Sequence, residues 1–420
     1  MNNSFIEGLH SWRLAGLSVE FKQTFRSLAV RNYRLFAIGH LISTCGTWMQ
    51  TVALSWLVYR LTGSAAALGV VSCAGYLPLL CLGYVGGFVV DRLGCRPVLI
   101  ATQVVALIQA ALLFSLTVTN LISIYWIIGL SLTTGLISAF ELPARQSLAP
   151  SLVSKADVTN AIGINSTIWN TARSIGPALA GLLIGTFGES ICFGLNALSY
   201  LASLVTLLKI DRNAIVGGGG RKQISDKTAS IGGVLCAKNV RDVLVFVSLM
   251  SIFGYQCGIL LPIVADKSIG GGAITLGLLS TATGIGALLS SLILASRGHS
   301  EVLRRGIGYA GFGMCAATAC IAYSTSLAVT FMACVVAGVA MTTAVIGGSS
   351  LLQSTIDPDI RGRIMALFSS VTFGITPVAA LIAGTLSEVI GVTYSLSISS
   401  LLLFTVAVIY LAVTKKPAAE

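Results

Sequence analysis

The sequence predicts an all-α membrane protein, with twelve transmembrane helices arranged as two pseudo-symmetric six-helix halves. Three observations lead to this prediction: the composition, a regular series of long apolar runs, and landmarks that recur between the two halves. Of the 420 residues, 55% are hydrophobic and 10% charged, with a mean hydropathy of +0.90. Soluble domains carry about 25% charged residues, so the composition argues against a water-soluble enzyme or a nucleic-acid-binding domain.

The predicted helices follow from the length of the apolar runs. A helix needs about 20 apolar residues to cross about 30 Å of hydrocarbon. Lipid offers no partners for free backbone groups, so each run must be helical. The runs that qualify are residues 33–59, 65–90, 97–118, 121–142, 159–186, 190–209, 242–265, 272–296, 304–323, 327–350, 362–386 and 391–413.

The basic residues predict the orientation of the chain. With the N-terminus in the cytoplasm, 23 of the 26 Lys and Arg residues fall in cytoplasmic segments. Arg60 and Lys267 fall outside, and Arg173 lies within the fifth span. Basic residues concentrate in the cytoplasmic loops of membrane proteins. We therefore expect a multi-pass protein of the cytoplasmic (inner) membrane with both termini inside, inserted by its first helix without a cleaved signal peptide. Membrane orientation also explains the net charge of +11.

The domain boundaries follow from the longest polar segment. We expect a six-helix bundle over residues 1–209, a cytoplasmic linker over 210–241, and a second six-helix bundle over 242–420. The two bundles share landmarks, because Leu68-Gly69 recurs as Leu276-Gly277, 208 residues later. Two similar halves about an axis along the membrane normal permit rocking around a central site.

A charged turn joins the second and third spans, with the sequence Gly87-Phe-Val-Val-Asp91-Arg92-Leu-Gly94-Cys95-Arg96. Gly87 would allow close helix approach and Gly94 a tight turn, while Asp91 could pair with a cation on a neighbouring helix when the cytoplasmic side closes. Such a charge biases a two-state equilibrium, and the alternative is an ordinary charge at a helix end. The run resembles the G-x-x-x-D-R-x-G-R-R signature of the major facilitator superfamily, except at Cys95. This resemblance implies the major facilitator fold and makes these residues, Arg92 and Arg96 included, a candidate cytoplasmic gate.

The fifth span contains Arg173-Ser-Ile-Gly176-Pro177-Ala-Leu-Ala-Gly181. Pro and Gly bend membrane helices and permit close packing, and simple packing would explain them as well. A charge in mid-span requires a cavity or a partner, so Arg173 is a candidate site residue. The segment is similar to the R-x-x-G-P-x-x-G-G pattern of exporters in this superfamily, which favours export.

The fourth span ends in Phe140-Glu141-Leu-Pro143-Ala-Arg145-Gln146. This segment resembles the F-D/E-x-P-A-R-Q segment of the branch that includes the enterobactin exporter and macrolide efflux pumps, as do residues 196–199 and 357–363. Burial raises the pKa of a carboxyl and a nearby Arg lowers it, so Glu141 could carry a proton. A static ion pair with Arg145 or Arg173 that fixes spans four and five is an equal alternative.

Polar and aromatic residues inside the spans are candidates for the lining of a substrate cavity. They are His40, Gln50, Asn165, Trp169, Asn170, Tyr255 and Gln256. His40 can titrate near neutral pH, although a lone His in a span is more often a hydrogen-bond donor that is packed or lines a cavity. For any single aromatic residue, packing is the commoner role.

Together these features predict a secondary transporter that works by alternating access. We expect a proton-coupled antiporter that exports a small amphipathic organic solute. A siderophore is the first candidate and a drug such as a macrolide the second, and both come from the resemblance. Import, lipid flipping by the same fold and a channel stay open as alternatives. The ten Cys and three His residues form no metal or catalytic pattern, and no nucleotide-binding loop completes the Gly217–Gly220 run. We therefore expect no enzyme activity, cofactor, metal ion or nucleic-acid partner, and a monomer.

Overall fold

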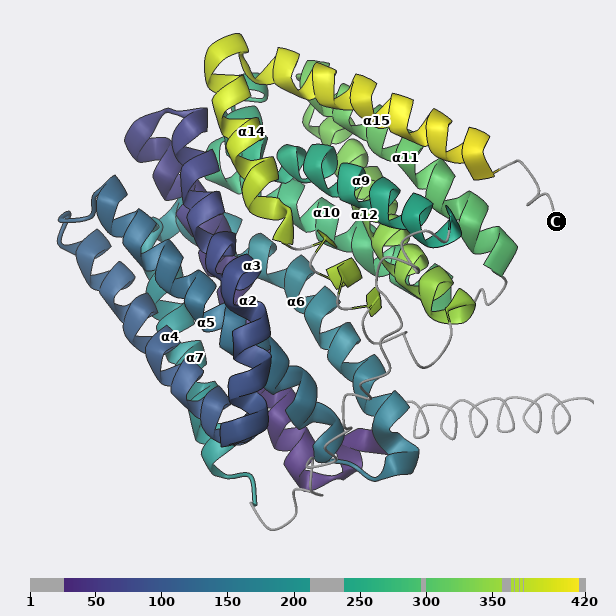
Figure 1. Ribbon diagram of the computed structural model, residues 1–420. Helices are drawn as coiled ribbons and strands as arrows, with labels where there is room; N and C mark the ends of the chain where they lie inside the picture. Colours follow the sequence, from purple (N-terminus) through teal and green to yellow (C-terminus); the bar gives the residue numbers. More distant parts are fainter. Residues whose placement is uncertain are drawn as a thin grey trace, which may run out of the picture.

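The computed structural model describes residues 26–211, 238–295, 300–356 and 364–414, apart from 366, 370 and 373. Most of the predicted linker and the stretch 357–363 lie outside these ranges. Within them the chain is helical, and each predicted span corresponds to a helix (Figure 1). The predicted all-α fold is thereby confirmed.

The first half comprises six long helices and two short 3-10 turns, η1 (Arg26–Ala29) and η2 (Lys155–Asp157). Its helices are α2 (Arg31–Thr62), α3 (Ala65–Leu93), α4 (Cys95–Val118), α5 (Ile124–Ser151), α6 (Val158–Phe187) and α7 (Ser190–Leu208). The second half comprises α9 (Lys238–Ile263), a π-helical turn η3 (Val264–Ser268), α10 (Gly272–Ala295), α11 (Ser300–Tyr323), α12 (Leu327–Thr355), α14 (Thr376–Ile390) and α15 (Val392–Thr414).

Nine of the helices in the described part of the chain are long and apolar enough to cross a membrane. The exceptions are α2, α6 and α14. α14 has only 15 residues, whereas α2 and α6 carry the polar residues that the sequence singled out. Helices α6 and α14 pack directly on the opposite half, against α10 and α3. Each of them therefore has a face turned toward the other half, where a polar side chain costs less than against lipid.

The two halves cross each other at two glycine contacts that repeat the same geometry. Between α6 and α10, a Cβ atom on Gly277 would lie 2.4 Å from the Cα of Gly181. Between α3 and α14, a Cβ atom on Gly69 would lie 3.0 Å from the Cα of Gly384. Small residues let membrane helices approach this closely. Gly69 and Gly277 are the landmarks that the sequence repeats, so the internal repeat becomes a symmetric pair of helix crossings.

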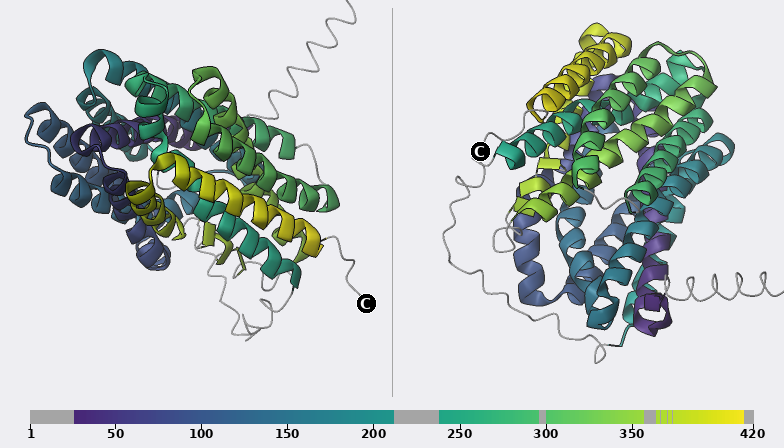
Figure 2. Two further views of the ribbon diagram at one scale, coloured as in Figure 1. Left: turned by 90° about the horizontal axis from the view of Figure 1, so that it is seen from above. Right: turned by 90° about the vertical axis from the view of Figure 1, so that its right-hand side faces the viewer.

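The ends of the bundle are named here after two of its turns. The Gly63 end contains the turns at Gly63, Gly188 and Gly391, where φ is 62°, 81° and 87°. The Gly94 end is the opposite one. Figures 1 and 2 show the two halves meeting near the Gly63 end and diverging toward the other end. The structure is therefore the arrangement in which the Gly63 end is closed.

Polar contacts between the halves hold the Gly63 end together. Tyr59 Oη donates to Asp266 Oδ2 at 2.9 Å. Glu388 accepts from the backbone N–H of Ala66 at 3.1 Å and from Ser64 Oγ at 2.9 Å, at the start of α3. The backbone donor, followed by the hydroxyl, holds the pKa of Glu388 below its ordinary value of 4.5. Ionised Glu388 therefore favours the closed end.

Candidate functional site

The predicted gate turn joins α3 directly to α4. Gly94 ends one helix and precedes the next with φ 87° and ψ 148°, a conformation that residues with a Cβ rarely adopt. Arg96 is buried, with 7% of its surface exposed. Its Nη2 donates to Leu207 O at 3.0 Å and to Leu208 O at 3.2 Å, and its Nε donates to Leu207 O at 3.2 Å. Arg96 thus caps the C-terminal carbonyls of α7, where a cation is favoured.

The expected role of Gly87 in close helix packing is wrong. A Cβ atom on Gly87 would meet nothing within 4 Å, whereas one on Gly86 would lie 2.0 Å from Ala139 O on α5. Neighbouring helical residues point about 100° apart, so only one of the two can face α5. Asp91 and Arg92 are exposed at the Gly94 end. Arg92 lies 5.6 Å from the centroid of the Phe88 ring, and Asp91 has no ion pair among the described residues. The gate role of Asp91 stays a prediction.

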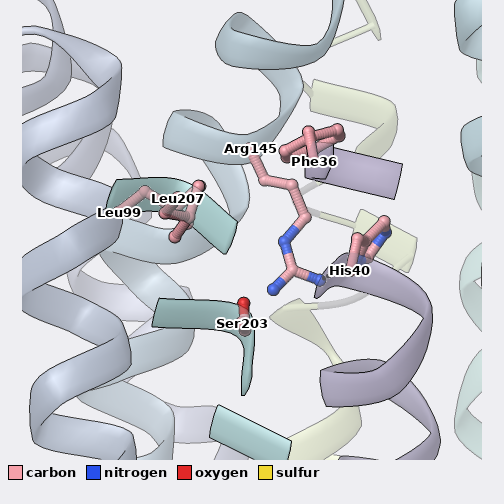
Figure 3. Close-up of a pocket in the computed structure, with 6 residues that line it drawn as sticks. All are labelled: Phe36, His40, Leu99, Arg145, Ser203 and Leu207. Atoms are coloured by element: carbon pink, nitrogen blue, oxygen red, sulfur yellow. Dashed lines mark hydrogen bonds between the residues drawn. The ribbon is translucent and has the colours of Figure 1, made fainter. Parts of the chain in front are cut away.

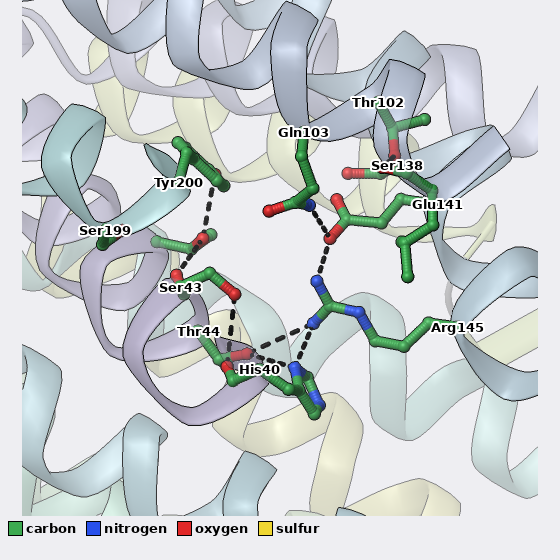
Figure 4. A network of polar contacts seen from close by, with 12 residues as sticks. His40, Ser43, Thr44, Thr102, Gln103, Ser138, Glu141, Arg145, Ser199 and Tyr200 are labelled. Carbon is green, nitrogen blue, oxygen red and sulfur yellow. Dashed lines mark hydrogen bonds and ion pairs between the residues drawn. The ribbon is translucent and has the colours of Figure 1, made fainter. Parts of the chain in front are cut away.

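A polar network inside the first half joins α2, α4 and α5 (Figure 4). Arg145 Nη2 pairs with Glu141 Oε1 one turn earlier on α5. The same carboxylate oxygen accepts from Gln103 Nε2 of α4 at 2.9 Å. The other terminal nitrogen of Arg145 contacts His40 Nδ1 and donates to Thr44 Oγ1 at 3.2 Å, both on α2. One guanidinium therefore lies between a carboxylate and an imidazole.

The donor chemistry of Arg145 limits the role of His40 in this contact. A guanidinium has donors only, so a hydrogen bond between the two requires His40 Nδ1 as the acceptor. The His40 Nε2 and the Asn165 Oδ1 of α6 are buried and have no hydrogen-bond partner in the described structure. A cavity of about 10 Å³ adjoins Arg145 and His40 (Figure 3), and such a volume accommodates about one water molecule. An unpartnered imidazole nitrogen, an unpartnered amide oxygen and room for about one water therefore adjoin the Arg145–Glu141 pair.

Arg173 lies apart from this network. The predicted pairing of Glu141 with Arg145 is present, but it lies within α5, so the pair does not join spans four and five. The guanidinium of Arg173 is instead 5.6 Å from the centroid of the Trp48 ring on α2. Trp169 meets Trp48 edge-on at 5.9 Å. Among the described residues, Arg173 has no ion pair or hydrogen bond through its side chain.

A cavity of about 80 Å³ lies between the halves, beside Arg173. The rest of its wall comes from the second half, including Tyr255, Cys257, Thr283, Met314, Cys334 and Met341. Tyr255 is one of the predicted cavity residues. The cysteines form no metal or catalytic pattern in the sequence, and nothing in the sequence distinguishes the two that reach the cavity.

Other predicted cavity residues lie in contacts between or along helices. Gln50 is buried in the first half, where it donates to Gln109 Oε1 at 3.2 Å and accepts from Asn196 Nδ2 at 2.8 Å. Gln256 is fully buried and accepts from Ser399 Oγ of α15 at 2.8 Å. The amide of Asn170 donates to the Ser166 carbonyl of its own helix at 3.0 Å. The structure therefore gives Gln50 and Gln256 packing contacts in place of a cavity position.

The glycines around Pro177 place α6 between two neighbours. A Cβ atom on Gly176 would lie 2.8 Å from Cys45 O of α2. On the next turn, Gly181 meets Gly277 of α10 across the junction between the halves. Pro177 lies inside α6, which continues through it as one helix. The segment thus packs closely against α2 on one side and α10 on the other, and Arg173 lies in it at the junction between the halves.

Comparison with known proteins agrees with this architecture. The family described as transmembrane secretion effector matches residues 22–420. The staphyloferrin A transporter of Staphylococcus aureus is 26% identical over 250 residues, which cover 59% of this chain and 63% of that one. The multidrug efflux pump Tap of Mycolicibacterium fortuitum is 26% identical over 399 residues, covering 89% and 94%. The crystal structure of the nucleoside transporter NupG superposes with a TM-score of 0.71 at 15% identity, covering 92% of this chain and 100% of that one. The chain therefore belongs to the transmembrane secretion effector family of the major facilitator superfamily and is a multi-pass membrane transporter, not an enzyme.

Proposed function

We propose that this transporter exports a small amphipathic organic solute in exchange for protons, by alternating access, with a siderophore as the first candidate. The observation that carries the proposal is the network of Glu141, Arg145 and His40. It contains a carboxylate and an imidazole on one cation, and it lies largely out of water. Ionisable groups of this kind within a membrane bundle mark proton or substrate pathways.

The network supplies a way for a proton to change the structure. Ionised Glu141 neutralises Arg145 and holds it toward α4 and α5. Protonated Glu141 no longer neutralises that cation, so Arg145 depends on His40 and Thr44 of α2 for its remaining contacts. α2 also carries Tyr59, which bonds to Asp266 of the second half at the Gly63 end. Protonation and the closure of that end are therefore connected through a single helix.

The orientation of the bundle gives the direction. We assign the Gly94 end to the cytoplasm, because the basic segments lie there. With the Gly63 end closed, the described arrangement then opens inward and would receive solute from the cytoplasm. The family description as a secretion effector supports export. The relative named for staphyloferrin A supports a siderophore, and the multidrug pump supports a drug as the second candidate.

Coupling is tested in everted membrane vesicles, whose cytoplasmic face points outward. An imposed pH gradient, acidic inside, should drive solute uptake by the wild type and not by Glu141→Gln, with both proteins present at equal amounts. Wild-type rates in Glu141→Gln would remove the carboxylate from the mechanism. Uptake only in right-side-out vesicles would support import, and flux that is independent of the gradient and does not saturate would indicate a channel.

The solute is identified by profiling the culture medium of a deletion strain grown with scarce and with plentiful iron. Loss of one secreted chelator, confined to scarce iron, would support the siderophore. An unchanged medium together with new antibiotic sensitivity would favour drug efflux and reject the first candidate.

A further inference from the structure

We propose that the solute is an amphipathic anion, whose acidic group binds Arg173 at the junction between the halves. The proposal rests on the proposed function in one respect, because it takes the central cavity as the place where solute binds. It goes further by specifying the charge of the solute and the residue that recognises it.

The first argument is the unneutralised charge. Arg173 lies about midway along α6, and the ring of Trp48 is the contact described for its guanidinium. A cation over an aromatic face is stabilised only in part, and a charge near the centre of a membrane bundle is costly unless it faces a cavity or a partner. An anion in the adjoining cavity would supply the missing counter-charge.

The second argument is that the protein supplies no carboxylate of its own there. None of the acidic side chains that the structure describes lines the cavity. Glu141, the one nearest mid-span, already bonds to Arg145 and Gln103. Glu189 and Asp266 belong to contacts at the Gly63 end. The guanidinium of Arg173 therefore stays available to a ligand.

The third argument is the chemistry of the opposite wall. Two cysteines and two methionines, Cys257, Cys334, Met314 and Met341, face the cavity from α9, α11 and α12. Thioethers are polarisable, flexible and well suited to apolar or aromatic groups of irregular shape. Tyr255 and Thr283 add hydroxyls to an otherwise apolar lining. A ligand with an acidic head and an apolar body matches both walls, whereas a cation would meet Arg173 unfavourably.

The position of Arg173 also connects binding to movement. A Cβ atom on Gly284 of α10 would lie 2.7 Å from the Arg173 carbonyl and 2.8 Å from Ser174 Cα, so the halves touch at this residue. An anion on Arg173 that also contacts the α9–α12 wall would bridge both halves. Such a ligand binds the two arrangements of the bundle unequally, which is the condition for shifting their populations.

The test uses two probes that share one aromatic skeleton. 8-Anilinonaphthalene-1-sulfonate is an anion, and N-phenyl-1-naphthylamine is its neutral counterpart. Binding to purified full-length protein in nanodiscs of zwitterionic lipid is measured from quenching of tryptophan fluorescence, with empty nanodiscs subtracted. Trp48 and Trp169 lie next to Arg173, so a probe bound there should quench them. No pH gradient is present, so the result is independent of proton coupling.

The wild type should bind the anion at least about tenfold more tightly than the neutral probe. Arg173→Gln should reduce this preference to about twofold or less while leaving the affinity for the neutral probe unchanged. Arg173→Lys should keep the preference. The matched control is Arg60→Gln, which removes a cation bonded to Glu189 at the Gly63 end and should behave as the wild type.

An anion preference that survives in Arg173→Gln, or is lost equally in Arg60→Gln, would overturn the assignment of the anion site. Tighter binding of the neutral probe by the wild type would overturn the anionic substrate class. A Glu141→Gln protein that binds the anion normally and keeps the proton-driven uptake of the wild type would contradict the proposed role of the carboxylate and leave this inference standing.

Discussion

Replacing Gly277 by alanine should open the Gly63 end of the transporter. In the described arrangement, a Cβ atom at this position would lie 2.4 Å from Gly181 Cα, 2.8 Å from Gly181 N and 2.8 Å from the Pro177 carbonyl oxygen. Non-bonded carbons rest about 3.5–4.0 Å apart, so α10 must move away from α6 by about 1 Å or more. All three contacts are backbone atoms of a helix, which cannot turn aside as a flexible side chain could.

The size of the effect follows from the cost of overpacking. Inserting a methyl group into a close-packed contact costs about 1–3 kcal/mol. Alanine stabilises a helix by about 1 kcal/mol over glycine, so any net loss must come from the contact between the halves. If the arrangement with the Gly63 end open avoids the clash, the equilibrium should shift toward it by about 5- to 150-fold.

The shift can be measured as a distance between spin labels on the two halves. Leu121 and Val389 are 67% and 81% exposed at the Gly63 end, so cysteines placed there in a cysteine-free background accept nitroxide labels. Double electron–electron resonance should show a longer distance population in Gly277→Ala. The matched controls are Gly163→Ala on α6 and Gly306→Ala on α11, where a Cβ atom meets nothing within 4 Å. Identical distance distributions in Gly277→Ala and the controls would refute the reasoning.

Three further substitutions test other parts of the structure. Arg96→Ala should lower the free energy of unfolding by about 1.5–3 kcal/mol, seen as a lower Tm, because the Leu207 carbonyl loses a buried charged donor; an unchanged Tm would contradict the cap. The folded contacts depress the pKa of Glu388. Its stabilisation of the closed Gly63 end should therefore persist above pH 4.5 and be lost as pH falls through the lowered pKa. Glu388→Gln should abolish this pH dependence, measured as the distance between the same two spin labels. Gln50→Ala should destabilise the first half by about 1–3 kcal/mol, because Asn196 loses a buried acceptor. The preference for the anionic probe should stay as in the wild type, and a changed preference would indicate that Gln50 lines the substrate cavity.

The sequence predicted the location of the helices well because hydrophobicity along the chain reports it directly. Each apolar run contains a helix in the described part of the chain. The turn at Gly94 was identifiable because glycine tolerates its positive φ readily. The pairing of Glu141 with Arg145 is similarly local, because residues four apart share one face of a helix. The sequence also identified Gly69 and Gly277 as repeated landmarks. It did not identify Gly384 and Gly181 as the glycines that they contact across the junction.

The candidate site was predicted less completely because it combines residues from separate helices. His40 meets Arg145 only because α2 packs beside α5, and Gln103 joins them from α4. Polar residues in an apolar span, such as Gln103, could have signalled this contact. No local signal separates Gln50, which packs within one half, from Tyr255, which faces the cavity.

By itself, then, the sequence determined the membrane-spanning helices, the duplication and the glycine turn at Gly94, because these depend on local hydrophobicity and on the absence of a Cβ. The rotation of each helix about its axis was decided only by the tertiary structure, and one residue changes that rotation by about 100°. This is why Gly86 and not Gly87 packs on Ala139. It is also why the sequence gives the charge of Arg173 but not its position beside a cavity. That position depends on how the two halves pack together.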